Sequence, residues 1–387
     1  MTGFTSGPRV LSASKLILFA LAAIVIVATI LPLFRQPYWW IRMFDFPRAQ
    51  IALIGLVVLA LFGIVNIGVA EASRAEWIAF ALLILAVGYQ CVRMYPYTPL
   101  ASEQTLAANA SVVSPDRHVR LAVSNVLMEN REIEQWKDVI LPHDPDVIAT
   151  VETDQWWADQ LTEALGDAYP HRILIPQDDT YGMCLFSKLP ITQSETRHLT
   201  EPEVPSLFVT LQLRSGEPLR LTLLHPRPPR PDIQQDSHLR DAELVRAARE
   251  VATFDEPTIV AGDLNDVAWS YTTNLFQKLT GFLDPRIGRG LYSTFHADHW
   301  WLRYPLDHVF HSDDLALVDL ERLGSVGGDH FPMLIELAID PTRRPLQDTP
   351  DTEADDQEEA REIIDDAEEF KAEESEAERE ERIEEDV

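Results

Sequence analysis

The chain has 387 residues, with 62 acidic and 32 basic side chains and a formal net charge of −30 at pH 7. This length allows two or three structural units. The acidic balance argues against a broad electrostatic grip on nucleic acid, but it does not exclude a small phosphate-bearing substrate. The charge is uneven, because residues 346–387 hold 21 acidic and 4 basic side chains. The two cysteines predict neither a disulfide framework nor a redox motif.

Three apolar segments near the N-terminus are candidates for membrane-spanning helices. They cover residues 16–34, 51–70 and 77–92. A spanning helix needs ~20 apolar residues, with a lower limit of about 17, so the third segment is marginal. A cleaved signal peptide is an alternative for the first segment but not for the other two. Residues 1–95 are therefore predicted to form a membrane domain with three transmembrane helices. The basic residues around these segments are nearly balanced, so the positive-inside rule favours neither orientation.

Residues 96–116 contain Pro, Ser, Ala and Asn without periodicity and predict a linker. The next part, residues 117–340, alternates strand and helix patterns. Strands are predicted at 119–123, 147–151, 182–186, 207–213, 219–224, 259–261, 306–310 and 333–337, and helices at 131–140, 156–165 and 238–252. This alternation predicts an α/β domain, and the hairpin-like strand pairs favour mixed sheets.

The segment 341–387 is rich in Glu and Ala and has few apolar residues. We expect it to be disordered or an exposed helix. A tethering or regulatory role is the alternative.

The most informative motif is Gly-Asp-Leu-Asn at residues 262–265, which follows an apolar strand pattern. It places a carboxylate and an amide at the C-terminal edge of a strand, where α/β sheets usually bind ligands. Such residues are also common in turns, so the motif alone is a weak signal. Further polar clusters at predicted strand ends strengthen it. Their main side chains are Asn125, Glu152, His225, Asp307, Asp329 and His330.

These residue types suit hydrolysis of a phosphate ester. That reaction requires charge neutralisation, a positioned water and assistance for the leaving oxygen. Carboxylate and amide oxygens suit Mg²⁺, which needs only one or two carboxylates and keeps several waters. The sequence contains no zinc-type ligand spacing.

As a set, the motifs resemble the endonuclease/exonuclease/phosphatase family over roughly residues 120–337, and in particular a subgroup with N-terminal membrane helices. The resemblance implies a four-layer α/β sandwich, in which two mixed β-sheets are flanked by helices, preceded here by three transmembrane helices. It also implies a phosphoesterase that depends on Mg²⁺ or Mn²⁺.

The resemblance assigns metal binding to Asn125 and Glu152, with Asp329 assisting the metal or water network. Asp263 would orient or deprotonate the attacking water, with Asn265 beside it.

The same resemblance implies that His330 binds the scissile phosphate and is polarised by Asp307. His225 would contact the phosphate and protonate the leaving group. One departure is Gly328, which stands where the family often has Ser, so one supporting hydrogen bond is in doubt.

Several arginines flank the motif loops and are natural bidentate ligands for phosphate. The candidates for substrate binding are Arg227, Arg286, Arg289 and Arg303. Ordinary surface charges are the alternative interpretation for each of them.

The leading functional hypothesis is therefore a membrane-anchored, divalent-metal-dependent phosphoesterase. The expected partners are a phosphate-ester substrate and a lipid bilayer, with no strong sign of extended nucleic-acid binding. The alternative is a non-catalytic membrane scaffold that keeps the fold and binds partners through its acidic tail.

Overall fold

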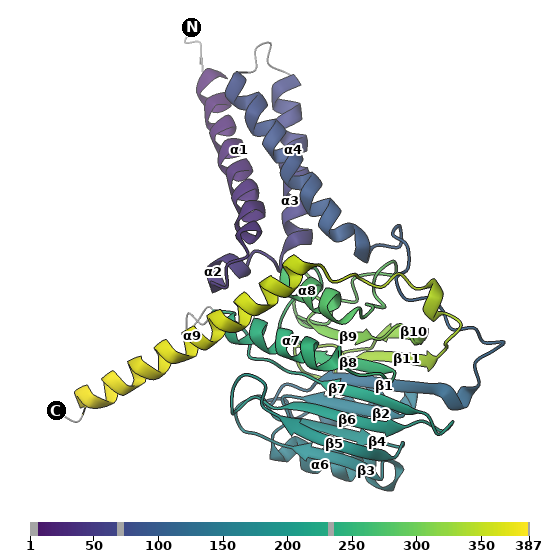
Figure 1. The fold of residues 1–387 in the computed structure, drawn as a ribbon. Coiled ribbons are helices and arrows are strands. Elements are labelled where there is room, and N and C mark those ends of the chain that lie inside the picture. Colours follow the sequence, from purple (N-terminus) through teal and green to yellow (C-terminus); the bar gives the residue numbers. More distant parts are fainter. Residues whose placement is uncertain (1–6, 68–72, 231–235, 386–387) are drawn as a thin grey trace. The chain divides into compact units, whose positions relative to one another are not determined.

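The protein consists of two compact units, Met1–Pro96 and Tyr97–Val387, and Figure 1 shows the elements of each. The computed structural model describes residues 7–67, 73–230 and 236–385.

The first unit is made of helices. They are α1 (Gly7–Ile30), a 3-10 turn (Leu31–Phe34), α2 (Trp39–Arg42), α3 (Arg48–Ile67) and α4 (Arg74–Met94). Three segments are long and apolar enough to cross a membrane, namely Ala13–Phe34, Arg48–Val65 and Arg74–Tyr97. They correspond to the three segments predicted from sequence.

The three long helices pack through an apolar cluster that includes Val25, Val58 and Leu83. On their other faces, large apolar side chains such as Leu16 and Leu85 are exposed. A helix that is apolar on both its packed and its open faces is typical of a membrane span.

The second unit contains two β-sheets. The six-stranded sheet has the order β10 (Leu315–Arg322), β11 (Met333–Ile339), β1 (His118–Asn125), β2 (Val147–Val151), β4 (Met183–Ser187), β3 (His171–Ile175). The five-stranded sheet has the order β5 (Ile191–Arg197), β6 (Ser206–Gln212), β7 (Pro218–Leu223), β8 (Thr258–Asp263), β9 (Asp307–His311). Strands β1 and β2 are parallel, as are β7 and β8, and the other pairs are antiparallel. Both sheets are therefore mixed.

The strands alternate between two apolar layers because successive side chains of a strand point to opposite faces. Leu121 and Val123 of β1 belong to the core between the sheets, together with Leu221 of β7. Ala122, between them, faces the helices that cover the six-stranded sheet. The result is the four-layer sandwich expected from the sequence.

Helices cover the outer face of each sheet. They are α5 (Ile133–Ile140) and α6 (Gln155–Leu165) on the six-stranded sheet, and α7 (His238–Val251) and α8 (Tyr271–Thr280) on the five-stranded one. Short 3-10 turns, among them Tyr95–Tyr97, Pro115–Arg117, Leu141–His143, Gly166–Ala168 and Arg344–Leu346, complete the connections.

The acidic tail forms one long helix, α9 (Ala354–Glu385), which runs along α7 in Figure 1. It is not simply exposed, because Ala360 is buried in the core and Phe370 stacks on His238 of α7 at 4.7 Å between ring centroids. Lys278 of α8 also pairs with Asp356 at 2.8 Å. The segment is thus helical, and most of its described residues are exposed, but one apolar face of the helix packs on the domain.

A buried carboxyl group makes the stability of this unit depend on pH. Glu243 of α7 is 1% exposed and accepts a hydrogen bond from the Ser206 hydroxyl at 2.9 Å. Burial raises the pKa of Glu243 from 4.5 to about 8. The unfolded chain loses this proton first, so the free energy of unfolding falls as the pH rises from about 4.5 through about 8.

We therefore expect Glu243→Gln to stabilise the protein at pH 8 and to flatten the decline of its melting temperature between pH 5 and 8. Thermal unfolding in detergent measures both effects, and Glu163→Gln, at an exposed position of α6, is the matched control. Equal pH profiles for wild type and Glu243→Gln would show that the carboxyl group is not protonated in the folded state.

Candidate functional site

Polar side chains from both sheets converge at one edge of the sandwich. Asp263, the last residue of β8, is shared by two overlapping groups whose potential ligand atoms lie within 4.8 Å of one another. One group adds Glu152 and His225, and the other adds Asp307 and His330. Each of these residues was predicted from its place at a strand end. The fold therefore brings them together from five separate stretches of sequence.

The backbone around this cluster depends on a glycine and on two residues in left-handed conformations. Gly262 has φ 138°, and a Cβ atom there would lie 1.9 Å from the carbonyl oxygen of Leu224. Only glycine allows β7 and β8 to approach so closely at their ends. Glu152 and Asn265 have φ 57° and 51°, values that are strained for residues other than glycine and that are often kept at functional sites.

Asn125 links the two sheets at the site. Its side-chain amide donates to Glu152 Oε1 at 2.8 Å and to Asp263 Oδ2 at 3.1 Å, while its Oδ1 accepts from the Leu127 N–H at 2.9 Å. Asn125 is 1% exposed. The amide thus holds two carboxylates close to each other at a largely buried position.

Asp307 and His330 form a hydrogen-bonded pair. His330 Nδ1 donates to Asp307 Oδ2 at 2.7 Å, and His330 Nε2 lies 3.5 Å from Asp263 Oδ2. Burial by itself lowers the pKa of His330, but the charges of Asp307 and Asp263 outweigh burial and hold this pKa above its ordinary value. The site therefore favours an imidazolium whose Nε2–H points toward Asp263.

Carboxyl groups in the site carry more negative charge than the imidazolium can offset. Burial raises the pKa of Glu152 to about 7, and the nearby charges of Asp263 and Asp329 add to that shift. Burial also raises the pKa of Asp329. Among the described residues, Asp307 Oδ1 and Asp329 Oδ1 are buried without a hydrogen-bond partner. Hard oxygen donors with surplus negative charge fit a divalent cation.

The predicted metal ligands occupy different places in this arrangement. Glu152 belongs to one of the two potential ligand groups, whereas Asp329 belongs to neither. In this structure Asn125 turns its NH₂ group toward the carboxylates. The amide therefore orders the carboxylates here, and its role as a ligand stays a prediction.

His225 is 2% exposed, and burial lowers its pKa, so the neutral imidazole is favoured. Its Nε2 lies 4.0 Å from Glu152 Oε1, too far for a hydrogen bond. Within the described residues its Nδ1 has no partner. Tyr181 covers the ring at 5.9 Å between centroids, a contact that the sequence did not indicate.

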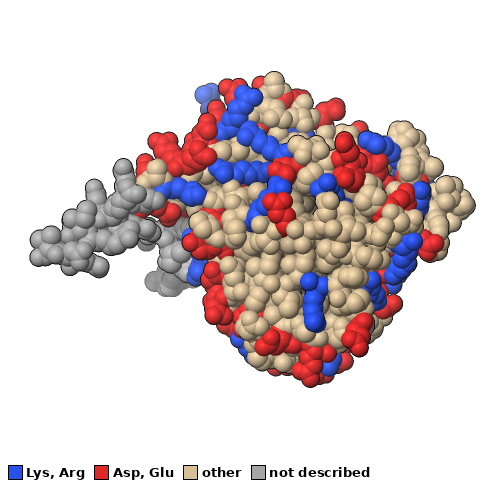
Figure 2. Space-filling view, turned by 60° about the horizontal axis from the view of Figure 1, so that its bottom comes forward, with Lys and Arg blue, Asp and Glu red and all other residues tan. Residues whose placement is uncertain are grey.

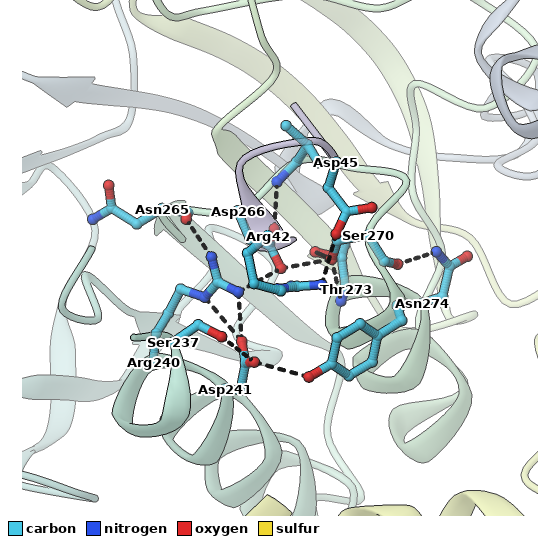
Figure 3. A network of polar contacts seen from close by, with 12 residues as sticks. Arg42, Asp45, Ser237, Arg240, Asp241, Asn265, Asp266, Ser270, Thr273 and Asn274 are labelled. Carbon is cyan, nitrogen blue, oxygen red and sulfur yellow. Dashed lines mark hydrogen bonds and ion pairs between the residues drawn. The ribbon is translucent and has the colours of Figure 1, made fainter. Parts of the chain in front are cut away.

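Asn265 supports the site rather than adding a second reactive group. Its N–H donates to Asp263 Oδ1 at 2.9 Å, and its side chain donates to the carbonyl of Pro226 at 3.0 Å, next to His225. Figure 3 shows Arg240 of α7 reaching the carbonyl oxygen of Asn265, at 2.9 Å. The amide therefore ties the Asp263 loop to the His225 loop.

Arg240 is a supporting residue that the sequence analysis missed. It is 1% exposed and pairs with Asp241 at 2.6 Å and with Asp266 at 3.3 Å. Through the Asn265 carbonyl it holds the loop in its left-handed conformation. Only the contact between α7 and this loop reveals the role, since Arg240 lies outside every motif.

Two of the four arginines predicted to bind substrate are structural. Arg286 is 1% exposed, pairs with Asp284 at 2.8 Å and lies 2.7 Å from His308 Nδ1. Arg289 pairs with Glu103 at 2.7 Å and donates to the Thr105 carbonyl at 2.6 Å. Their charges are already used inside the domain, so the structure argues against the predicted substrate contacts.

The other two arginines lie nearer to the site residues. Arg227 pairs with Glu201 at 2.5 Å and lies over the ring of Tyr181, which covers His225. Arg303 lies over the ring of Phe331, the residue after His330.

Comparison with known proteins places this site in a family. The sequence model described as "Endonuclease/Exonuclease/phosphatase family" matches residues 122–330, a range that contains each polar residue of the site described above. A search of curated protein sequences found no match.

Three solved structures illustrate the similarity in fold. The human Nocturnin catalytic domain with bound sulfate anion is 17% identical, with 59% of this chain and 97% of that chain covered and a TM-score of 0.47. Sphingomyelinase C from Streptomyces griseocarneus is 16% identical, with 57% and 99% covered and a TM-score of 0.43. An endonuclease/exonuclease/phosphatase from Beutenbergia cavernae is 18% identical, with 58% and 72% covered and a TM-score of 0.46.

The family match covers more than half of the chain and includes the strand-end residues that meet around Asp263. The chain belongs to the endonuclease/exonuclease/phosphatase family.

Proposed function

We propose that this protein is a divalent-metal-dependent phosphoesterase, anchored in a membrane by its three apolar helices, that hydrolyses a phosphate ester by attack of an activated water. The observation that carries the proposal is the convergence of acidic and imidazole groups around Asp263, in overlapping sets within 4.8 Å. A structural ion-pair network would balance these charges, whereas this cluster keeps an excess of carboxylates.

In the proposed reaction, Asp263 accepts a hydrogen bond or a proton from the attacking water. Its Oδ1 is already fixed by the Asn265 N–H and its Oδ2 by Asn125. A carboxylate held in this way is pre-oriented for a water in front of it, which reduces the cost of positioning.

His330 provides positive charge for the phosphate oxygens. Asp307 fixes its ring by the 2.7 Å hydrogen bond to Nδ1, which leaves Nε2–H as the donor. His225, neutral and buried beside Glu152, would contact a second phosphate oxygen or the leaving group.

The donor set also supports a metal-dependent reaction. Glu152, with Asn125 and Asp329, would hold a divalent cation, and Mg²⁺ or Mn²⁺ suits these oxygen donors. When bound, such a cation supplies charge neutralisation and a Lewis acid for the phosphate.

The net charge of −30 favours a small or membrane-bound substrate over a long polynucleotide. On the face seen in Figure 2, basic side chains are interspersed with acidic ones around an uncharged area. This pattern differs from the continuous basic surface that extended nucleic acids usually require.

The first test is metal binding without turnover. A ligand that binds only the folded state raises the melting temperature, so saturating Mn²⁺ should raise it by several degrees in wild type. Glu152→Gln should lose most of this rise, whereas Glu163→Gln should keep it. An equal rise in Glu152→Gln would place the bound ion elsewhere, and no rise in wild type would favour the non-catalytic scaffold.

The second test is activity on a panel of phosphomonoesters and phosphodiesters with Mg²⁺ or Mn²⁺. Asp263→Asn and His330→Gln should each lower kcat at least about 100-fold, because each removes a positioned group that acts in the transition state. Asp167→Asn, at an exposed position outside the site motifs, is the control. Activity that survives both site substitutions would come from a different site.

The third test concerns the membrane. Three apolar helices should keep the full-length chain in the membrane pellet after alkaline carbonate extraction, while detergent should release it. Release by carbonate alone would show that the helices do not span the bilayer.

A further inference from the structure

Two arginines beside the site share one aromatic ring. The guanidinium carbon of Arg303 lies 5.0 Å from the ring centre of Phe331, and that of Arg322, the last residue of β10, lies 4.1 Å from it. Phe331 directly follows His330, so their Cα atoms are about 3.8 Å apart. Both arginines therefore contact the residue that directly follows His330, which we assign to the phosphate.

Neither guanidinium is neutralised by an acid. The hydrogen bonds of these two side chains go to backbone carbonyls, from Arg303 to Ala297 at 3.4 Å and from Arg322 to Ser293 at 3.2 Å. No carboxylate within the described parts of the chain lies within 4.0 Å of either one, and Arg303 Nε is buried without a partner. By contrast, Arg227, Arg286 and Arg289 of the neighbouring loops all have acidic partners.

This pairing of like charges is unexpected in a chain with 62 acidic and 32 basic residues. Two half-buried guanidiniums repel each other, and burial together with the charge of Arg303 lowers the pKa of Arg322. An anion bound by both would offset the repulsion, because each planar guanidinium can donate two parallel hydrogen bonds to a phosphate group.

The arginines are fixed to the same backbone that frames the site. The N–H of Ala297 donates to the carbonyl of Asp329 at 2.7 Å, and the N–H of Phe331 donates to the carbonyl of Thr294 at 2.9 Å. The ring of Phe295 packs against His330 at 5.0 Å. Residues 295–304 form a hairpin that carries Arg303 and is joined in this way to the segment that carries His330. A ligand that contacts both Arg303 and His330 would therefore be held by rigid elements.

We propose that Arg303 and Arg322 form a second anion subsite, which binds a phosphate group of the substrate other than the one that is hydrolysed. This inference rests on the proposed function and narrows it to substrates with two phosphate groups in one small molecule or one lipid headgroup. The net charge of −30 favours such a compact substrate over a polynucleotide.

Binding tests this subsite separately from catalysis. Calorimetry on full-length Asp263→Asn in detergent, with EDTA, compares 1,3-propanediol monophosphate with 1,3-propanediol bisphosphate. The bisphosphate should bind about tenfold more tightly, as expected for added charge-assisted hydrogen bonds. Adding Arg303→Gln and Arg322→Gln should remove this gain and leave the affinity for the monophosphate unchanged. Arg172→Gln, an exposed arginine on β3 at the opposite edge of the same sheet, should keep the gain.

Arg322→Lys separates a binding role from a structural one. Lysine keeps the charge but loses the planar fork, so part of the gain should remain with an unchanged melting temperature. The subsite would be overturned if Asp263→Asn bound the bisphosphate no more tightly than the monophosphate. It would also be overturned if the preference for the bisphosphate survived the double arginine substitution. Bisphosphate selectivity without turnover by wild type would contradict the proposed function alone, and turnover without selectivity would contradict the subsite alone.

Two further ligands identify the source of the second phosphate. Phosphatidylcholine vesicles that carry phosphatidylglycerol phosphate present a diester and a monoester in one headgroup, and the deacylated headgroup presents them in solution. Arginine-dependent binding of either one supports the subsite, and preference for the vesicle assigns it to lipid. Arginine-dependent binding of a single-stranded oligonucleotide, without binding of either small ligand, would overturn the compact-substrate proposal.

Discussion

Repulsion among the carboxylates around Asp263 is the constraint on which the rest of the site depends. Glu152 and Asp307 both approach this buried residue, and like charges at such distances destabilise a fold unless they are compensated. The Asn125 amide and the His330 imidazolium supply part of the compensation. The remaining negative charge creates a binding site for a cation, and it explains why we connect this geometry with metal-dependent chemistry.

Apolar packing in the sandwich offsets the energetic cost of this arrangement. Two continuous apolar layers cover the sheets, so the strand ends can hold strained backbone without losing the fold. The left-handed conformations of Glu152 and Asn265 turn the chain at the points where side chains must face the site. Arg240 adds a buried support from the helical layer, which links the packing of α7 to the orientation of the Asp263 loop.

Much of the central fold could be predicted from sequence, because buried strands such as β2 are continuous apolar runs that end in polar residues. The edge strand β5 was missed, since its side chains are mostly exposed and polar. The site residues were predicted because polar clusters follow or begin the apolar strand patterns and together resemble the motifs of the family. The burial of Arg286 and the packing of Phe370 could not be predicted, because each depends on a partner chosen only by the tertiary fold. Arg322 was missed for the same reason, since only the tertiary fold brings it and Arg303 over the Phe331 ring.

The most direct test of a cation at the carboxylate cluster is anomalous diffraction from crystals of the full-length protein grown with Mn²⁺. We predict a peak within coordination distance of the Glu152 carboxylate, close to Asp263, and loss of this peak in Glu152→Gln. A fully active protein whose crystals show Mn²⁺ only at other positions, or no Mn²⁺ at all, would contradict it.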